Sequence, residues 1–60
     1  MNDTKVIYET LLRHIREQQY PDLKNLSRAY GCSTSIVKKY LNQMIKLNMI
    51  EQQGEYYNEC

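Results

Sequence analysis

The 60-residue sequence has no tryptophan or phenylalanine, and only one proline, two glycines and two cysteines. No run of aliphatic side chains exceeds two residues, so we expect no membrane-spanning segment. Two cysteines, Cys32 and Cys60, are too few for the disulfide framework of a small secreted domain. With the single His14 they do not make a structural zinc site, and we expect no metal and no cofactor.

The sequence also lacks the residue sets of catalysis, namely paired carboxylates, a phosphate-binding loop or a nucleophile beside a base. A chain of this length buries only about 60% of its unfolded surface, which leaves no room for an enclosed cleft. We therefore expect neither an enzyme nor a small-molecule binder. The N-terminus shows no basic region followed by an apolar stretch, so we expect a cytoplasmic protein with one domain over residues 1–60.

Apolar residues at three- and four-residue intervals predict three helices, at about 4–18, 22–30 and 33–47. The apolar positions of the first helix are Ile7, Tyr8, Leu11, Leu12 and Ile15, whereas Val6 falls on the solvent-exposed side. Those of the second are Leu23, Leu26, Ala29 and Tyr30. Those of the third are Val37, Tyr40, Leu41 and Met44, with Ile36 and Leu47 at the margin of the buried arc.

Particular residues mark the ends of these helices. Asp22, after Pro21, is a good N-cap for the second helix, and Gly31 permits a sharp turn at its end. Ser33 can cap the third helix, and Asn48 stands where a left-handed residue commonly ends one.

Residues 49–58 predict a β-hairpin, with Gln53-Gly54 as a two-residue turn. This turn pairs Ile50 with Tyr57 and Glu51 with Tyr56. Because side chains alternate across a strand, one of the two tyrosines is expected to cover the core and the other to be free for a partner. The predicted fold class is therefore mainly α with a small β-hairpin.

Residues 26–41 are the distinctive stretch, because two short helices that meet at a Gly-bearing turn make a helix-turn-helix. In this arrangement Cys32 is expected to fill the elbow as a small buried side chain. Ser27 lies where the two helices cross closely, so its side chain must be small.

This stretch resembles the helix-turn-helix of bacterial winged-helix repressors, particularly the GntR-like and LexA-like kinds. The residues that carry the resemblance are Leu26, Ser27, Gly31, Cys32, Ser33 and Val37, with Tyr20-Pro21 and Asn48-Met49-Ile50 on either side. The resemblance implies a three-helix winged helix-turn-helix that binds DNA, in which the hairpin is the wing.

Two features depart from that pattern. Ser27 stands where alanine is more usual, which is harmless if its hydroxyl bonds back to the preceding turn. Glu51, Glu55 and Glu59 make the wing acidic where these repressors often carry Arg or Lys, which puts contact between the wing and phosphates in doubt.

The charges are distributed unevenly although the formal net charge is only +1. Residues 23–50 carry five basic side chains and no acidic one, whereas residues 51–60 carry three acidic side chains and no basic one. The positive charge therefore lies on the two helices that would meet a polyanion.

The docking pattern of the resembled repressors implies roles for individual residues. The candidates for base contact are Thr34, Ser35, Lys38 and Asn42. The candidates for phosphate contact are Lys24, Arg28, Ser33, Lys39 and Lys46. The candidates in the wing are Gln52, Gln53 and Gly54. The competing interpretation is that these residues are the solvated polar face of any surface helix.

Two functions follow from this pattern. The first is a sequence-specific double-stranded DNA-binding regulator, such as a repressor, whose third helix enters the major groove. If about four cations each neutralise a phosphate, log K falls against log[salt] with a slope near −3.6. That affinity is modest for one copy, so we expect a homodimer or help from a larger regulatory protein. The second is a winged-helix adapter that binds protein, as an antirepressor or co-regulator, which the acidic wing favours.

Overall fold

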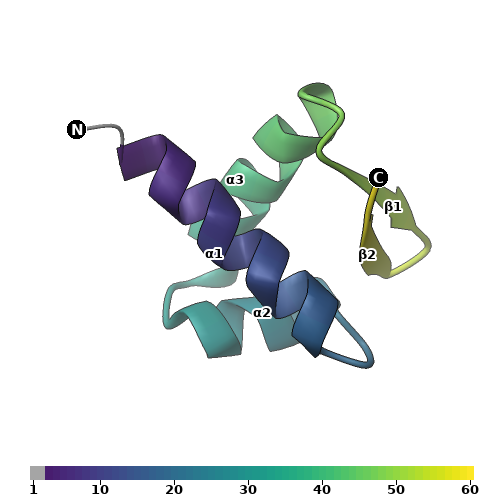
Figure 1. Cartoon of the computed structure of the whole chain (residues 1–60). Coiled ribbons are helices and arrows are strands. Elements are labelled where there is room, and N and C mark those ends of the chain that lie inside the picture. Colours follow the sequence, from purple (N-terminus) through teal and green to yellow (C-terminus); the bar gives the residue numbers. More distant parts are fainter. Residues whose placement is uncertain (1–2) are drawn as a thin grey trace.

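The computed structural model describes residues 3–60, which form three helices followed by an antiparallel hairpin (Figure 1). The elements are α1 (Asp3–Glu17), α2 (Leu23–Tyr30), α3 (Thr34–Lys46), β1 (Ile50–Gln53) and β2 (Tyr56–Glu59). The helix bounds agree with the predicted ranges to within one residue at each end. The chain is mainly α with a small β-hairpin, so the predicted fold class is confirmed, and the arrangement is consistent with three helices and a hairpin wing.

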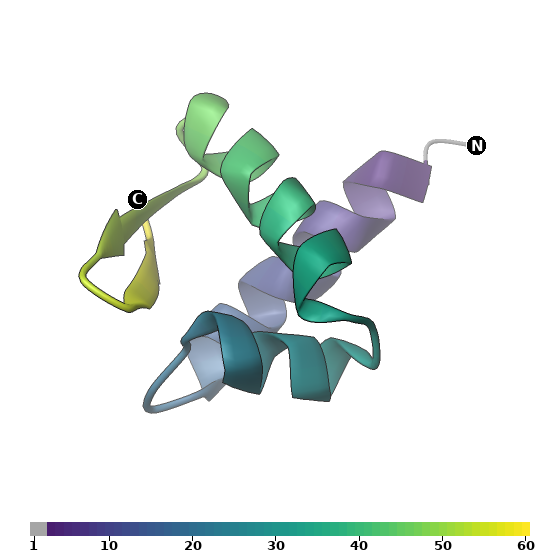
Figure 2. The same cartoon turned by 180° about the vertical axis from the view of Figure 1, so that it is seen from behind.

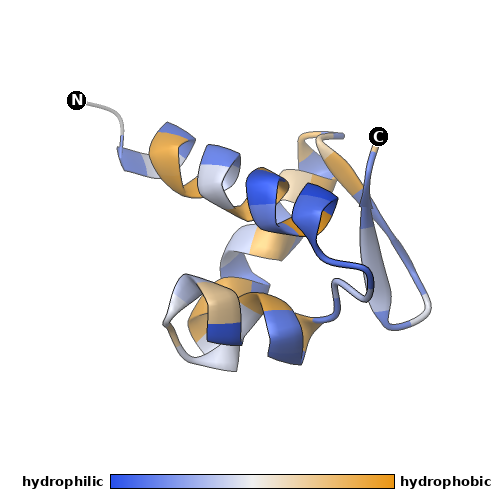
Figure 3. Ribbon diagram, turned by 60° about the horizontal axis from the view of Figure 1, so that its bottom comes forward, coloured by the Kyte–Doolittle hydropathy of each residue, from blue (hydrophilic) through white to orange (hydrophobic). Residues whose placement is uncertain are grey.

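One core joins all five elements. Its buried members are Leu11, Ile15, Leu26, Val37, Leu41, Met44, Ile50 and Tyr57. In Figures 1 and 2 α1 and α3 cross one another, with α2 beneath both and the hairpin at the side. Hydrophobic and hydrophilic residues alternate along each helix (Figure 3), so each helix turns one side to the core and leaves the other to solvent.

Local hydrogen bonds cap both helices of the α2–α3 pair. The Asp22 side chain accepts a hydrogen bond from the backbone N–H of Asn25 at 2.7 Å, which caps α2. Gly31 ends α2 in the left-handed region, with φ 84°, and its N–H donates to the carbonyl oxygen of Ser27 at 2.8 Å. Ser33 then caps α3 through its hydroxyl. These caps set where each helix of the motif begins and ends.

The end of α3 turns the chain into the hairpin. Asn48 adopts φ 60°, and its N–H donates to the carbonyl oxygen of Ile45 at 3.0 Å. The N–H of Met49 donates to the carbonyl oxygen of Met44 at 2.9 Å. This pair of bonds is the Schellman motif, and it confirms the left-handed role predicted for Asn48.

The predicted register of the hairpin is wrong. The observed pairs are Ile50–Glu59, Glu51–Asn58, Gln52–Tyr57 and Gln53–Tyr56, so the turn is Gly54-Glu55. Gly54 has φ 61° and therefore occupies the first turn position, where a type II′ turn needs a positive φ. Because the turn moves by one residue, each pairing moves by two, and Ile50 and Tyr57 still share the buried face.

The hairpin also gains a neighbour that the sequence did not predict. The N–H of Tyr57 donates to the carbonyl oxygen of Pro21 at 3.0 Å, and Asp22 forms an isolated bridge with Tyr56. The ring of Tyr56 lies 5.9 Å from that of Tyr20, at an interplanar angle of 44°. Tyr57 covers the core, as one of the pair should, and Tyr56 stays exposed, as the other should, although its ring also packs against Tyr20.

Two expectations about burial near the motif are wrong, those for Cys32 and Ala29. Cys32 is exposed and does not fill the elbow. Tyr30 lies there half-buried, and its pKa is raised by burial and by the neighbouring Cys32 and Tyr40. Ala29 is exposed. The Ser27 side chain is buried as expected, but its hydroxyl has no hydrogen-bond partner among residues 3–60 and does not bond back to the preceding turn.

Candidate nucleic-acid interface

The outer side of α3 carries a shallow depression, here called the α3 surface. It is lined by Ser35, Lys38, Lys39, Asn42, Gln43 and Lys46. These residues share one side because Val37, Leu41 and Met44 are buried on the opposite side of the same helix. Every residue of the α3 surface carries a hydroxyl, amide or ammonium group that can donate a hydrogen bond, and none is acidic.

Gln43 belongs to the α3 surface although sequence reasoning did not single it out. Its side-chain oxygen Oε1 accepts a hydrogen bond of 2.6 Å from the hydroxyl of Tyr8 on α1. This bond holds the amide in place, and among residues 3–60 the side-chain N–H groups of Gln43 make no hydrogen bond. The available signal was spacing, because Gln43 follows Lys39 by four residues and so lies on the same side of the helix.

A second depression, here called the wing cleft, adjoins the first. It is lined by Asp22, Leu23, Lys24, Lys38, Gln52, Gly54, Glu55 and Tyr57. Lys38 borders both depressions. The structure thus brings Lys24 of α2, Lys38 of α3 and Gln52 of the wing to one place, although they are far apart in the sequence.

Other candidates line neither depression. Thr34 and Arg28 are exposed, and Ser33 is occupied as the cap of α3. Gln53 lies on the outer side of the hairpin, where its side chain bonds to Asn58 at 3.4 Å and to Glu51 at 3.5 Å. Gln53 is therefore turned away from the wing cleft.

The cations of the two depressions are uncommitted. Within the described part of the chain, the ion pair observed is that of Arg16 with Glu59, so Lys24, Lys38, Lys39 and Lys46 have none. The carboxylate of Glu55 lies in the wing cleft with two of these lysines, without reaching ion-pair distance. An anion that approaches α3 therefore meets positive charge, whereas one that approaches the wing also meets Glu55.

The chain matches no known protein family, curated protein or solved structure. What the site can do is therefore inferred from its own geometry and charge. Among residues 3–60, no three His, Cys, Asp or Glu side chains gather as a metal site would require. None of the helices in the same range is long and apolar enough to cross a membrane.

Proposed function

We propose that the chain is a sequence-specific double-stranded DNA-binding transcriptional regulator that inserts α3 into the major groove. The observation that carries this proposal is the α3 surface, an exposed depression lined entirely by hydrogen-bond donors and containing three lysines. DNA offers the complementary chemistry, with anionic phosphates along both strands and acceptor atoms on the base edges.

Within this proposal some residues of α3 and its surroundings contact base edges and others contact phosphates. Lys38 donates to O6 and N7 of guanine, and Asn42 makes a two-point contact with adenine. Thr34 and Ser35, in the first turn of α3, read the adjoining base edges. Lys39 and Lys46 contact phosphates, as do Lys24, Arg28 and Ser33.

The carboxylate of Glu55 alters the role of the wing. Since Glu55 lines the wing cleft, it repels a phosphate at that point. Gln52 and Gly54 border the same cleft and remain able to approach the DNA. Affinity then depends on α2 and α3, and a homodimer on two half-sites about one helical turn apart supplies what one copy lacks.

The test is a titration of the purified chain against pooled random duplexes at 50 and 200 mM salt, followed by sequencing of the bound fraction. The proposal predicts enrichment of a short motif and a slope near −3.6 per copy for about four phosphates. Lys38→Ala is expected to relax base preference at one position. Lys46→Ala is expected to weaken binding to all sequences and to reduce the slope by about 1.

Glu17→Ala is the control, because it removes an exposed charge from α1, outside both depressions. It should leave base preference unchanged. Unchanged preference and affinity in a folded Lys38→Ala variant would refute the role given to α3.

The second candidate is a winged-helix adapter that binds another DNA-binding protein, as an antirepressor or co-regulator. The carboxylates of Glu51 and Glu55, both exposed on the hairpin, favour it because they oppose contact with DNA. It predicts no binding to duplex DNA at 50 mM salt, together with binding to a basic regulator that Glu55→Lys abolishes. The titration therefore separates the two candidates.

A further inference from the structure

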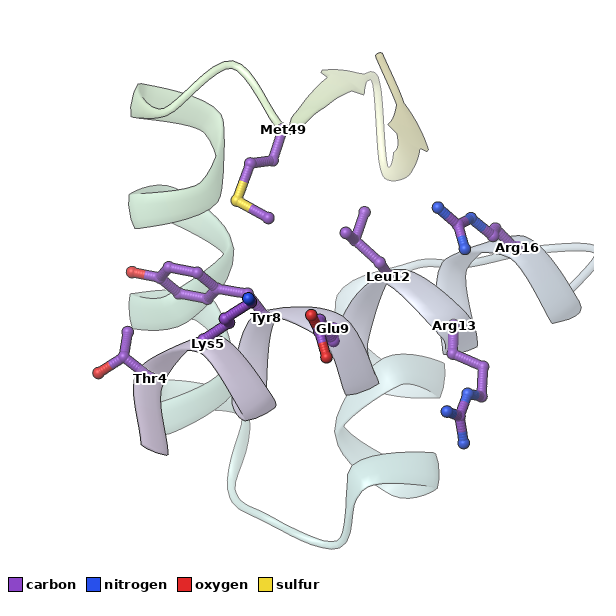
Figure 4. A pocket seen from close by; sticks show the side chains of 8 residues that line it. All are labelled: Thr4, Lys5, Tyr8, Glu9, Leu12, Arg13, Arg16 and Met49. Carbon is purple, nitrogen blue, oxygen red and sulfur yellow. The ribbon is translucent and has the colours of Figure 1, made fainter. Parts of the chain in front are cut away.

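A groove of about 670 Å³ runs along α1 on a different side of the molecule from the α3 surface, and none of its lining residues is shared with that surface. Figure 4 shows Met49, from the connection between α3 and β1, facing Tyr8 and Leu12 of α1. All three side chains are only half-buried. The groove therefore exposes apolar surface to water, although a chain of this length has only a small hydrophobic core.

The apolar floor of this groove is held in position. The Tyr8 hydroxyl donates to Gln43 of α3, and the backbone N–H of Met49 bonds to the carbonyl oxygen of Met44. Both walls thus have a fixed shape before any partner arrives, which lowers the entropic cost of binding.

The rim of the groove carries two uncommitted charges of opposite sign. Glu9 and Arg13 are both exposed, stand four residues apart on α1 and form no ion pair within residues 3–60. Arg16, further along the rim, is instead engaged by Glu59 through two hydrogen bonds. A partner that covers the groove therefore meets a carboxylate and a guanidinium one helical turn apart.

This pattern is complementary to itself when a second α1 lies antiparallel. With a rise of 1.5 Å per residue, Glu9 and Arg13 lie about 3 Å on either side of a two-fold axis midway between them. Each Glu9 then faces the partner's Arg13. Leu12 lies about 1.5 Å from the same axis, so the two copies of Leu12 meet over the apolar floor.

From this self-complementarity we propose that the α1 groove is the interface of a homodimer, in which two α1 helices cross antiparallel at Leu12. A register shifted by about half a turn, with the axis at Glu9 or at Arg13, opposes like charges and is disfavoured. The interface is isologous, so it closes at two copies and does not extend into a filament. It joins the two copies of the DNA-binding regulator proposed above. Only the biological role of the dimer rests on that proposed function.

Charge reversal with sedimentation equilibrium tests the interface without DNA, so failure of the DNA proposal and failure of this one are distinguishable. Glu9→Arg creates two pairs of facing arginines across the axis, and Arg13→Glu creates two pairs of facing glutamates. Each reversal alone is expected to weaken dimerisation about ten-fold or more. An equimolar mixture of the two variants is expected to dimerise at least as well as the unaltered chain, because all four facing charges then attract.

Glu51→Arg is the control, since it reverses an exposed charge on the hairpin, and it should leave the dimer unchanged. Far-UV circular dichroism verifies the fold of each variant, and Glu9→Gln with Arg13→Gln replaces any variant that misfolds. A chain that stays monomeric at millimolar concentration overturns the proposal and leaves the groove to a different protein. A dimer indifferent to both reversals, or a mixture that stays monomeric, overturns it as well.

Discussion

Replacement of Ser27 by alanine is expected to stabilise the protein. The Ser27 side chain is 5% exposed, and its hydroxyl oxygen is buried without a hydrogen-bond partner in residues 3–60. A buried unpaired hydroxyl costs about 1–3 kcal/mol, and the higher helix propensity of alanine contributes about 0.5 kcal/mol more. A void of roughly 12 Å³ left by the oxygen subtracts about 0.3 kcal/mol.

The net gain in the free energy of unfolding is therefore about 2 kcal/mol. For a domain of this size that corresponds to a rise in Tm of roughly 8–16 °C. Urea denaturation followed by circular dichroism measures it as a higher midpoint with an unchanged slope. Ser35→Ala is the matched control, because Ser35 is exposed on α3 and only its helix propensity changes.

A Ser27→Ala variant that is no more stable than the Ser35→Ala variant would refute the reasoning. In that outcome the hydroxyl would have a partner in solution, and its burial would carry no penalty. A loss of stability would further mean that the oxygen contributes more through packing than it costs through desolvation.

Three other predictions follow. Gly31→Ala is expected to lower the free energy of unfolding by about 1–2 kcal/mol, because Gly31 has φ 84°. A Cβ at this position would meet no atom within 4 Å, so the cost is conformational alone. Thermal denaturation measures it as a lower Tm, and an unchanged Tm would contradict it. The hydrogen bond from Arg16 lowers the pKa of Glu59 from its ordinary value of 4.5, so the stabilisation is present above pH 4.5 and lost as the pH falls below it. Glu59→Gln should flatten that acid limb of a Tm-against-pH profile, and an identical limb in the variant would refute the assignment. Glu55→Gln should strengthen binding to random duplexes at 50 mM salt, whereas Glu51→Gln, outside the wing cleft, should change it less; equal effects would show that only net charge matters.

The helices were predictable because their signals are local. Periodic apolar residues, the Asp22 cap and the αL residues Gly31 and Asn48 each act within a turn of the chain, and the structure has all of them. The exposed side of α3 followed from the same periodicity, since burial of Val37 and Leu41 leaves Lys38 and Asn42 outward.

The features that the sequence did not predict depend on contacts between distant segments. The hydrogen bond from Tyr57 to Pro21 joins residues 36 positions apart, so no local sequence pattern predicts it. The hairpin register depended on which side of Gly54 the turn lies, which a single glycine leaves open. Cys32 was assigned to the core on residue type, but half-buried Tyr30 lies at the elbow and Cys32 is left outside.

The bond between Tyr57 and Pro21 ties the hairpin to the residue immediately before the Asp22 cap. A ligand that pulls on the hairpin therefore also strains the start of α2, because one peptide group stands between the strand and the capping carboxylate. Displacement of the hairpin and fraying of the first turn of α2 are therefore expected to occur together. Anything that clamps the hairpin in place also stiffens the entrance to the helical pair.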